Sequence, residues 1–157
     1  MTDYLEDLSV GDEFYTPGRT ITEADVVAFA GLTGDYASIH TDEEYAKASI
    51  HGRRIAHGLL GLAYAQGLTW RVSSGEGARL ASLGWEDWRF LQPIFIGDTI
   101  RVRCRVVSAR QSSSNPTRGV VVEELEILNQ HDEVTQRGRH ATLVPVRDPE
   151  ATEPLTA

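Results

Sequence analysis

The stretch from Ala56 to Trp70 constrains the fold of this 157-residue chain more than any other segment. It has the composition of a helix, and its first half is apolar on nearly every side. A helix without a polar face does not lie on a protein surface, so other elements must enclose it. We therefore predict a central buried helix around which the rest of the chain is wrapped.

Three glycines, Gly58, Gly61 and Gly67, interrupt this predicted helix. Glycine weakens a helix by about 1 kcal/mol relative to alanine, so each position needs a reason. We attribute Gly61 and Gly67 to close packing against strands. Gly58 lies in the first predicted turn, where amide N–H groups lack intrahelical partners and the helix dipole is positive. It can hold an oxyanion there, and a packing glycine at a helix start is the alternative.

The segments after this helix have the pattern of strands. From Ile100 to Val106, Ile, Val and Cys side chains alternate with arginines, which places them on opposite faces of a strand. Further strands are predicted over residues 81–89, 119–128 and 134–146. Residues 12–19 are predicted to form a short strand that runs into a turn at Pro17-Gly18. Strands that follow a helical segment, instead of alternating with helices, favour an α+β fold with an antiparallel sheet.

A shorter helix is predicted to begin at Thr22, which can cap it, with Asp25 three positions later. Gly31 and Gly34 are expected to end it. Its buried stripe is predicted to consist of Val26, Val27, Phe29 and Ala30. Thr41 is predicted to cap the next helix, in which Tyr45 and Ala46 pack inward.

Between these two helices, the residues from Gly34 to Asp42 carry a carboxylate at Asp35 and an imidazole at His40. Their small and turn-forming residues favour a tight loop. A histidine titrates near neutral pH, and burial can raise the pKa of a carboxyl group, so the pair could transfer protons in both directions. The alternative is a linking loop whose aspartate caps a helix and whose histidine is merely exposed.

Composition and charge argue against several classes of protein. The net charge of -8 disfavours nucleic acid as a general partner. The single cysteine, Cys104, cannot form an internal disulfide, which is typical of the cytoplasm. The acidic N-terminus does not resemble a signal peptide, and the apolar run from Ile55 to Ala65 is too short to span a membrane. No CxxC, HExxH, phosphate-loop or GxGxxG motif is present, so neither a metal nor a nucleotide is expected.

Three blocks of sequence, in order, resemble the MaoC-like, (R)-specific enoyl-CoA hydratases. Residues 32–46 are similar to the family signature Gly-Asp-x-Asn-Pro-Ile-His-x-Asp and the short helix that follows it. Residues 54–60 are similar to the family's entry into its central helix, and residues 90–100 to its strand–turn–strand segment with Pro and Gly-Asp. The resemblance extends from about Thr22 to Val144. The chain departs from the signature at Ala37-Ser38, where the family has Asn-Pro.

The resemblance implies the hot-dog fold, an α+β architecture in which an antiparallel sheet wraps around a central buried helix. We predict a single MaoC-like domain over residues 1–148 and a loose tail over residues 149–157. A homodimer, or an oligomer built from dimers, is expected because one such domain leaves apolar surface in need of cover.

The resemblance also implies a hydro-lyase that hydrates an enoyl-CoA thioester or dehydrates a 3-hydroxyacyl-CoA. Asp35 and His40 would then be the catalytic pair, and the Gly58 amide would hold the developing oxyanion. His57 is assigned to the same substrate-binding turn. Its ring could face the pocket or satisfy a backbone carbonyl, and we favour the second. No cofactor is expected, because coenzyme A enters only as part of the substrate.

The arginine rows suggest contacts with the coenzyme A phosphates, because guanidinium groups suit phosphate geometry. Cross-strand pairs with Glu124 and Glu126 would account for most of these arginines, however. Arg118, which follows a polar loop, is the preferred phosphate contact.

Two other functions remain open from the sequence. Hot-dog domains also include acyl-CoA thioesterases, although the Asp-x4-His spacing favours hydration. A non-catalytic acyl-CoA-binding subunit is the other alternative, because the chain lacks the Asn-Pro of the family at Ala37-Ser38.

Overall fold

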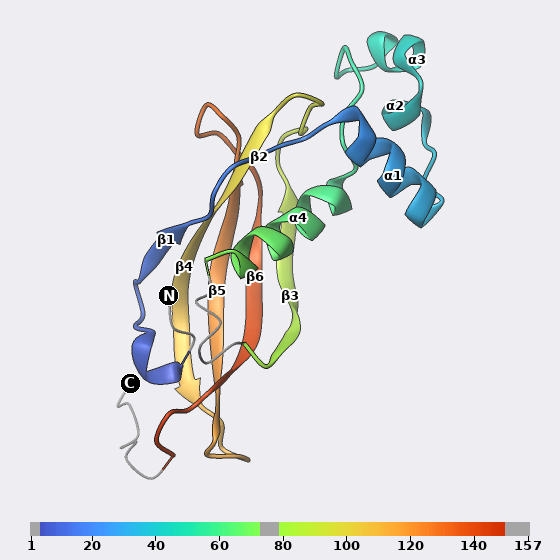
Figure 1. Cartoon of the computed structure of the whole chain (residues 1–157). Helices are drawn as coiled ribbons and strands as arrows, with labels where there is room; N and C mark the ends of the chain where they lie inside the picture. The colour runs from blue at the N-terminus through green and yellow to red at the C-terminus, as the bar shows by residue number, and fades with distance from the viewer. Residues whose placement is uncertain (1–3, 73–78, 150–157) are drawn as a thin grey trace.

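An antiparallel sheet curves around one long helix in the computed structural model, which describes residues 4–72 and 79–149 (Figure 1). Within these residues the strands follow the order β1-β4-β5-β6-β3, and β2 also pairs with β4. The strands are β1 (Glu13–Tyr15), β2 (Arg19–Thr20), β3 (Ala81–Phe90), β4 (Thr99–Gln111), β5 (Arg118–Leu128) and β6 (Val134–Pro145). The helices are η1 (Leu5–Asp7), α1 (Glu23–Thr33), α2 (Ser38–Thr41), α3 (Glu43–Ala48) and α4 (Gly58–Trp70). The predicted α+β fold is confirmed.

The main core lies between α4 and the face of the sheet that α4 crosses. It is formed by buried aliphatic side chains that include Leu60, Ala65 and Leu68 of α4, Ile100 and Val102 of β4, and Leu125 and Ile127 of β5. Burying each large aliphatic side chain contributes about 1.5–3 kcal/mol. The predicted alternation along β4 is confirmed, since Ile100, Val102, Cys104 and Val106 are all at most 1% exposed.

The helix α4 is not enclosed on every side within one chain. Leu59 is 59% exposed and Trp70 is 48% exposed, so the prediction of a fully buried helix is only partly correct. Gly61 does pack closely, because a Cβ there would lie 2.9 Å from Ile94. The same explanation is wrong for Gly67, where a Cβ would meet no atom within 4 Å.

The start of α1 matches its prediction. Thr22 caps the helix, and the side chains of Thr22 and Asp25 form a reciprocal capping box. The helix runs past Gly31 and ends at Gly34, whose φ of 77° is left-handed. Val27 was wrongly assigned to the buried stripe, because it is 57% exposed.

The segment around α2 and α3 differs from its prediction. Residues 38–41 form a helical turn, α2, where a loop was predicted. Asp42 caps α3 in place of Thr41, because its carboxylate accepts from the Tyr45 amide at 3.0 Å. Ala46 is buried as predicted, whereas Tyr45 is 57% exposed.

The opposite face of the sheet carries the row of arginines on β4 and the glutamates that face them on β5. The predicted cross-strand pairs are present, since Arg103 bonds Glu126 and Arg105 bonds Glu124. Exposed ion pairs of this kind contribute about 0–1 kcal/mol each to the free energy of unfolding. Their main effect is to keep this face of the sheet hydrated.

None of the described helices has the length and hydropathy needed to cross a membrane. Apart from its first residue, the predicted loose tail over residues 149–157 lies outside the described residues.

A buried histidine is expected to make the fold sensitive to acid. His140 is 1% exposed and stacks on Trp85 with ring centroids 4.0 Å apart. Burial and the nearby Arg79 guanidinium lower the pKa of His140 to about 4 from 6.5. The unfolded chain therefore binds this proton more tightly, so stability is complete above pH 6.5 and falls as the pH drops towards 4. The loss should approach about 3 kcal/mol.

Urea unfolding between pH 7 and pH 4 measures this effect. The variant His140→Gln should flatten the dependence of the unfolding free energy on pH. The matched variant His131→Gln, in an exposed turn, should leave that dependence unchanged. Equal slopes for wild type and His140→Gln would contradict the assignment.

Candidate active site

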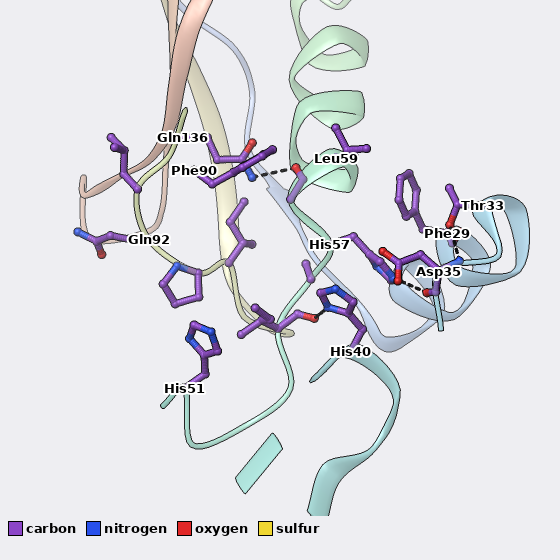
Figure 2. A pocket seen from close by; sticks show the side chains of 16 residues that line it. Phe29, Thr33, Asp35, His40, His51, His57, Leu59, Phe90, Gln92 and Gln136 are labelled. Atoms are coloured by element: carbon purple, nitrogen blue, oxygen red, sulfur yellow. Dashed lines mark hydrogen bonds between the residues drawn. The ribbon is translucent and has the colours of Figure 1, made fainter. Parts of the chain in front are cut away.

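One cavity brings together the Asp35–His40 segment and the start of α4 (Figure 2). Its volume is about 460 Å³, within the range of small-molecule sites. The residues that line it come from α1, α2, the start of α4, β6 and the loop after β3, and include Phe29, Asp35, His40, His57, Gly58, Phe90, Ile94 and Gln136. Four of the five predicted site residues, all except Arg118, therefore meet at one cavity.

The carboxylate of Asp35 and the rings of His40 and His57 lie close together. One donor atom from each of the three lies within 4.8 Å of the others. The Asp35 side chain is exposed, whereas His40 is half-buried. One water molecule can therefore contact both the carboxylate and an imidazole, as acid–base chemistry requires.

The protonation of His40 follows from its contacts. Its Nδ1 lies 2.8 Å from the Ile55 carbonyl, which can only accept, so Nδ1 carries the proton. In the neutral ring Nε2 is then the basic nitrogen. Burial and the neighbouring His57 lower the pKa of His40 below 6.5, against the opposing effects of the Ile55 carbonyl and Asp35. The ring is therefore mainly neutral at pH 7 and can accept a proton.

His57 contacts both Asp35 and His40. Its Nε2 donates to the backbone carbonyl of Asp35 at 2.9 Å, the type of contact expected from the sequence. Its ring lies against that of His40, with centroids 3.9 Å apart, and it is only 2% exposed. His57 thus fixes the backbone at Asp35 and the plane of the His40 ring.

The three donor groups raise the question of a metal ion. The planes of the His40 and His57 rings are tilted by 31° to each other, with centroids 3.9 Å apart. The lone pair of an imidazole nitrogen lies in the plane of its ring. The lone pairs of His40 and His57 therefore point in similar directions and do not converge on one point. The arrangement suits proton transfer better than the convergent coordination that zinc requires.

Gly58 begins α4 and lines the cavity. Its amide belongs to the first helical turn, and within the described part of the chain it donates to no acceptor. A Cβ at this position would lie 2.7 Å from the Phe90 ring, so a side chain cannot be added without displacing Phe90. Glycine at this position therefore leaves room for the Phe90 side chain of β3.

The loop holds its shape without the Asn-Pro of the family. The Asp35 carboxylate accepts from the Ala37 amide at 3.2 Å, and the Thr33 hydroxyl accepts from the Asp35 amide at 3.2 Å. The Thr41 hydroxyl lies 3.2 Å from the Tyr36 carbonyl, to which it donates. Backbone and hydroxyl groups thus fix the segment that carries Asp35.

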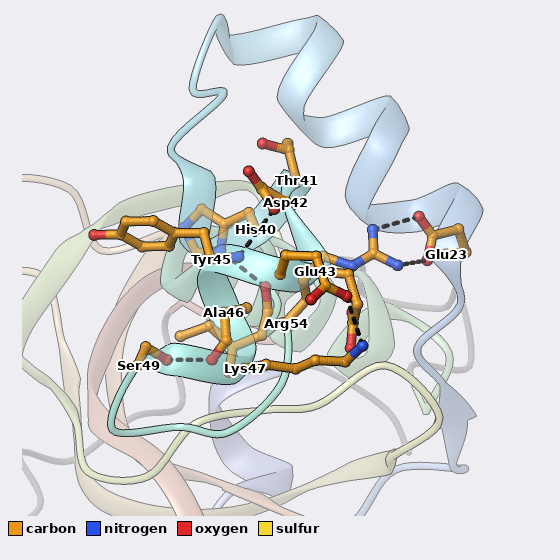
Figure 3. Close-up of polar contacts among 12 residues, drawn as sticks. Glu23, His40, Thr41, Asp42, Glu43, Tyr45, Ala46, Lys47, Ser49 and Arg54 are labelled. Atoms are coloured by element: carbon orange, nitrogen blue, oxygen red, sulfur yellow. Dashed lines mark hydrogen bonds and ion pairs between the residues drawn. The ribbon is translucent and has the colours of Figure 1, made fainter.

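Arg54 braces the helices on either side of the loop, a role not predicted from the sequence (Figure 3). It donates twice to Glu23 of α1, at 2.7 Å each, and once to Glu43 of α3, at 3.0 Å. The paired carboxylates raise the pKa of its guanidinium group. A sequence signal existed, because both glutamates stand in the first turn of a predicted helix, but their common partner is a long-range contact.

Arg118 lies away from the cavity within one chain. It begins β5, whereas the cavity residue Gln136 pairs with Ile127 near the other end of that strand. At about 3.3 Å per residue the separation along β5 is about 30 Å. The structure therefore does not bring Arg118 to Asp35 and His40.

Comparison with known proteins identifies the family. Residues 7–127 match the family model of the MaoC like domain. The chain belongs to the MaoC-like domain family.

Among relatives, this MaoC-like chain is 44% identical over 100 residues to protein MaoC of Klebsiella aerogenes, covering 64% of this chain and 29% of that protein. It is 33% identical over 97 residues to an (R)-specific enoyl-CoA hydratase of Rhodospirillum rubrum, covering 62% of this chain and 65% of the relative. The chain thus spans less than two thirds of the length of these relatives.

Among solved structures, the MaoC-like dehydratase from Rhodospirillum rubrum superposes with a TM-score of 0.83 at 32% identity, covering 92% of this chain and 98% of that one. A Mycobacterium tuberculosis protein with a double hotdog fold superposes with a TM-score of 0.79 at 21% identity, covering 98% of this chain and 52% of that one. The second likeness concerns the fold alone. The predicted hot-dog fold is confirmed.

Proposed function

We propose that this MaoC-like domain is a hydro-lyase that adds water to an enoyl-CoA thioester, or removes it from a 3-hydroxyacyl-CoA. The observation that carries the proposal is the placement of the Asp35 carboxylate and the His40 ring within 4.8 Å of each other in one cavity. Gly58 lines the same cavity. The names of the relatives, which include a hydratase and dehydratases, support the same reaction.

In the proposed hydration, Nε2 of His40 takes a proton from a water molecule that Asp35 orients. The water oxygen attacks C3, and the electron pair of the double bond moves towards the thioester oxygen. The Gly58 amide donates to that oxygen while it carries negative charge. The proton that His40 has taken then passes through Asp35 to C2, so that one water molecule is added across the double bond and both residues return to their starting forms.

We further propose that no cofactor takes part. The thioester carbonyl itself makes the C2 position acidic, and the helix start supplies the electrostatic stabilisation. Coenzyme A enters as part of the substrate. Cys104 is a buried thiol, in keeping with the cytoplasmic location that we propose.

Incubation with crotonyl-CoA tests the activity. The conjugated enoyl thioester absorbs in the ultraviolet, and its absorbance should fall as 3-hydroxybutyryl-CoA forms, without release of free thiol. Release of free coenzyme A in place of hydration would favour a thioesterase. Binding of the thioester without any reaction would favour a non-catalytic acyl-CoA-binding subunit.

We propose a homodimer as the working form. Within the described part of the chain, β3 pairs only with β6, so its other edge is open. Leu83 and Phe90 of β3 are 53% and 56% exposed, and Leu59 of α4 is 59% exposed. An open strand edge beside apolar side chains is normally covered, and a second copy can cover it symmetrically.

Sedimentation velocity tests the assembly. Wild type should sediment at about twice the 17.3 kDa of one chain. The variant Leu83→Glu should shift the protein towards the monomer, because it places a charge at the apolar edge, and the charge-reversal variant Arg105→Glu on the outer face should not. A wild type that is monomeric at micromolar concentration would contradict the dimer.

A further inference from the structure

The buried side chain of Gln136 connects the sheet to the first turn of α4. Its Nε2 donates to the Gly58 carbonyl at 3.0 Å, a bond shown as a dashed line in Figure 2. Its Oε1 accepts from the indole Nε1 of Trp88 at 3.1 Å. Gln136 is 2% exposed, so neither contact can be replaced by bulk water. Both ends of the amide are therefore fixed by protein groups.

The packing around Gln136 leaves room for this contact. A Cβ at residue 61 would lie 2.4 Å from the Gln136 Nε2, so glycine is needed there for the amide to reach α4. The three groups come from different elements, with Trp88 on β3, Gln136 on β6 and Gly58 on α4. Hydrogen bonds thus connect the helix start to β6 directly and to β3 through Gln136. Such bonds are directional, whereas apolar packing alone fixes the position of a helix less strictly.

The position of this turn matters for the reaction. An oxyanion donor is effective when it lies about 2.7–3.1 Å from the charged oxygen, and a misplacement of about 1 Å can reduce a rate about 10²-fold. The N–H and the carbonyl of Gly58 belong to adjacent peptide planes, and in a helix both lie nearly parallel to the axis. A bond that anchors the carbonyl of Gly58 therefore anchors the first turn of α4, to which its N–H also belongs.

We propose that Gln136, oriented by Trp88, is a positioning residue that aims the Gly58 amide at the thioester oxygen. The inference rests on the proposed hydratase function. Negative charge on that oxygen develops mainly in the transition state, so the effect of Gln136 falls on kcat and much less on KM.

The variant Gln136→Met tests this role, because methionine has a similar length and no amide. We expect kcat for crotonyl-CoA to fall about 10- to 100-fold, with KM changed by less than about threefold. The matched control is Thr135→Val on the same strand. Thr135 is fully buried and its hydroxyl donates to the Ile127 carbonyl at 3.0 Å, so this variant removes a buried hydrogen bond without touching α4.

Thr135→Val should lower thermal stability and leave kcat unchanged. If Gln136→Met does not fold, Trp88→Phe serves in its place, since it removes the donor that orients Gln136 and should lower kcat in the same direction by a smaller factor. An equal loss of kcat in Thr135→Val and Gln136→Met would overturn the proposal, because it would show a general effect of core damage.

The infrared spectrum of a bound thioester tests the same role by a property that does not depend on protein stability. Butyryl-CoA is saturated and cannot be hydrated, and its carbonyl stretching frequency should be lower when bound to wild type than in water. In Gln136→Met the frequency should return towards the value in water. Hydration of crotonyl-CoA by wild type, with unchanged kcat and carbonyl frequency in Gln136→Met, would overturn this inference alone. Failure of wild type to hydrate any enoyl thioester would instead overturn the proposed function.

Discussion

Replacing His40 with alanine should lower kcat for crotonyl-CoA hydration by about 10²–10⁴-fold, the usual contribution of a general acid–base group. Asp35→Ala should cause a loss of the same order, because the two side chains act on one water molecule. Their donor atoms lie within 4.8 Å of each other, so the double variant should be little worse than either single variant. Steady-state kinetics with saturating substrate measures the effect.

The fold of both variants should remain intact, which circular dichroism and thermal unfolding can check. Asp35 is exposed and His40 is half-buried, so neither replacement leaves a large cavity in the core. His131→Ala, in the exposed turn between β5 and β6, is the matched histidine control and should retain full activity. Near-normal turnover by either Asp35→Ala or His40→Ala would defeat the proposed mechanism.

Gly58→Ala is expected to have the second large effect, a loss of about 10²–10³-fold in kcat. The new methyl group would lie 2.7 Å from the Phe90 ring, so either Phe90 or the helix start must move. Movement of the helix start takes the Gly58 amide away from the thioester oxygen. KM should change much less than kcat, because the lost interaction belongs to the transition state.

Two further variants separate this effect from a general weakening of the helix. Gly67→Ala is the matched control, because a Cβ at this position of α4 meets no atom within 4 Å. It should stabilise the protein by up to about 1 kcal/mol and leave kcat unchanged. The double variant Gly58→Ala with Phe90→Ala removes the steric conflict and should recover part of the lost activity. Full activity in Gly58→Ala alone would contradict the expected loss and would show that Phe90 moves while the helix start stays in place.

Some parts of the structure could be predicted because their causes are local. The capping box of Thr22 and Asp25 depends on residues three positions apart, and it is present as predicted. The alternation along β4 follows from the side-chain period of a strand, and its buried face is the predicted one. Where two local signals competed, the prediction failed. Thr41 and Asp42 can both cap a helix, and the carboxylate of Asp42 is the group used.

The sequence by itself determined the family, the α+β fold and most of the order of helices and strands, because short spacing and hydrophobic period carry that information. It also singled out Asp35, His40 and Gly58 as candidates for one site. Only the tertiary structure decided how these groups are held. Gln136 bonds the carbonyl of Gly58 from 78 positions away, and Arg54 joins Glu23 from 31 positions away. The tertiary structure also decided that Arg118 lies at the end of β5 that is remote from the cavity. Contacts of this kind arise from the closure of the sheet on α4, and no local spacing in the chain encodes them.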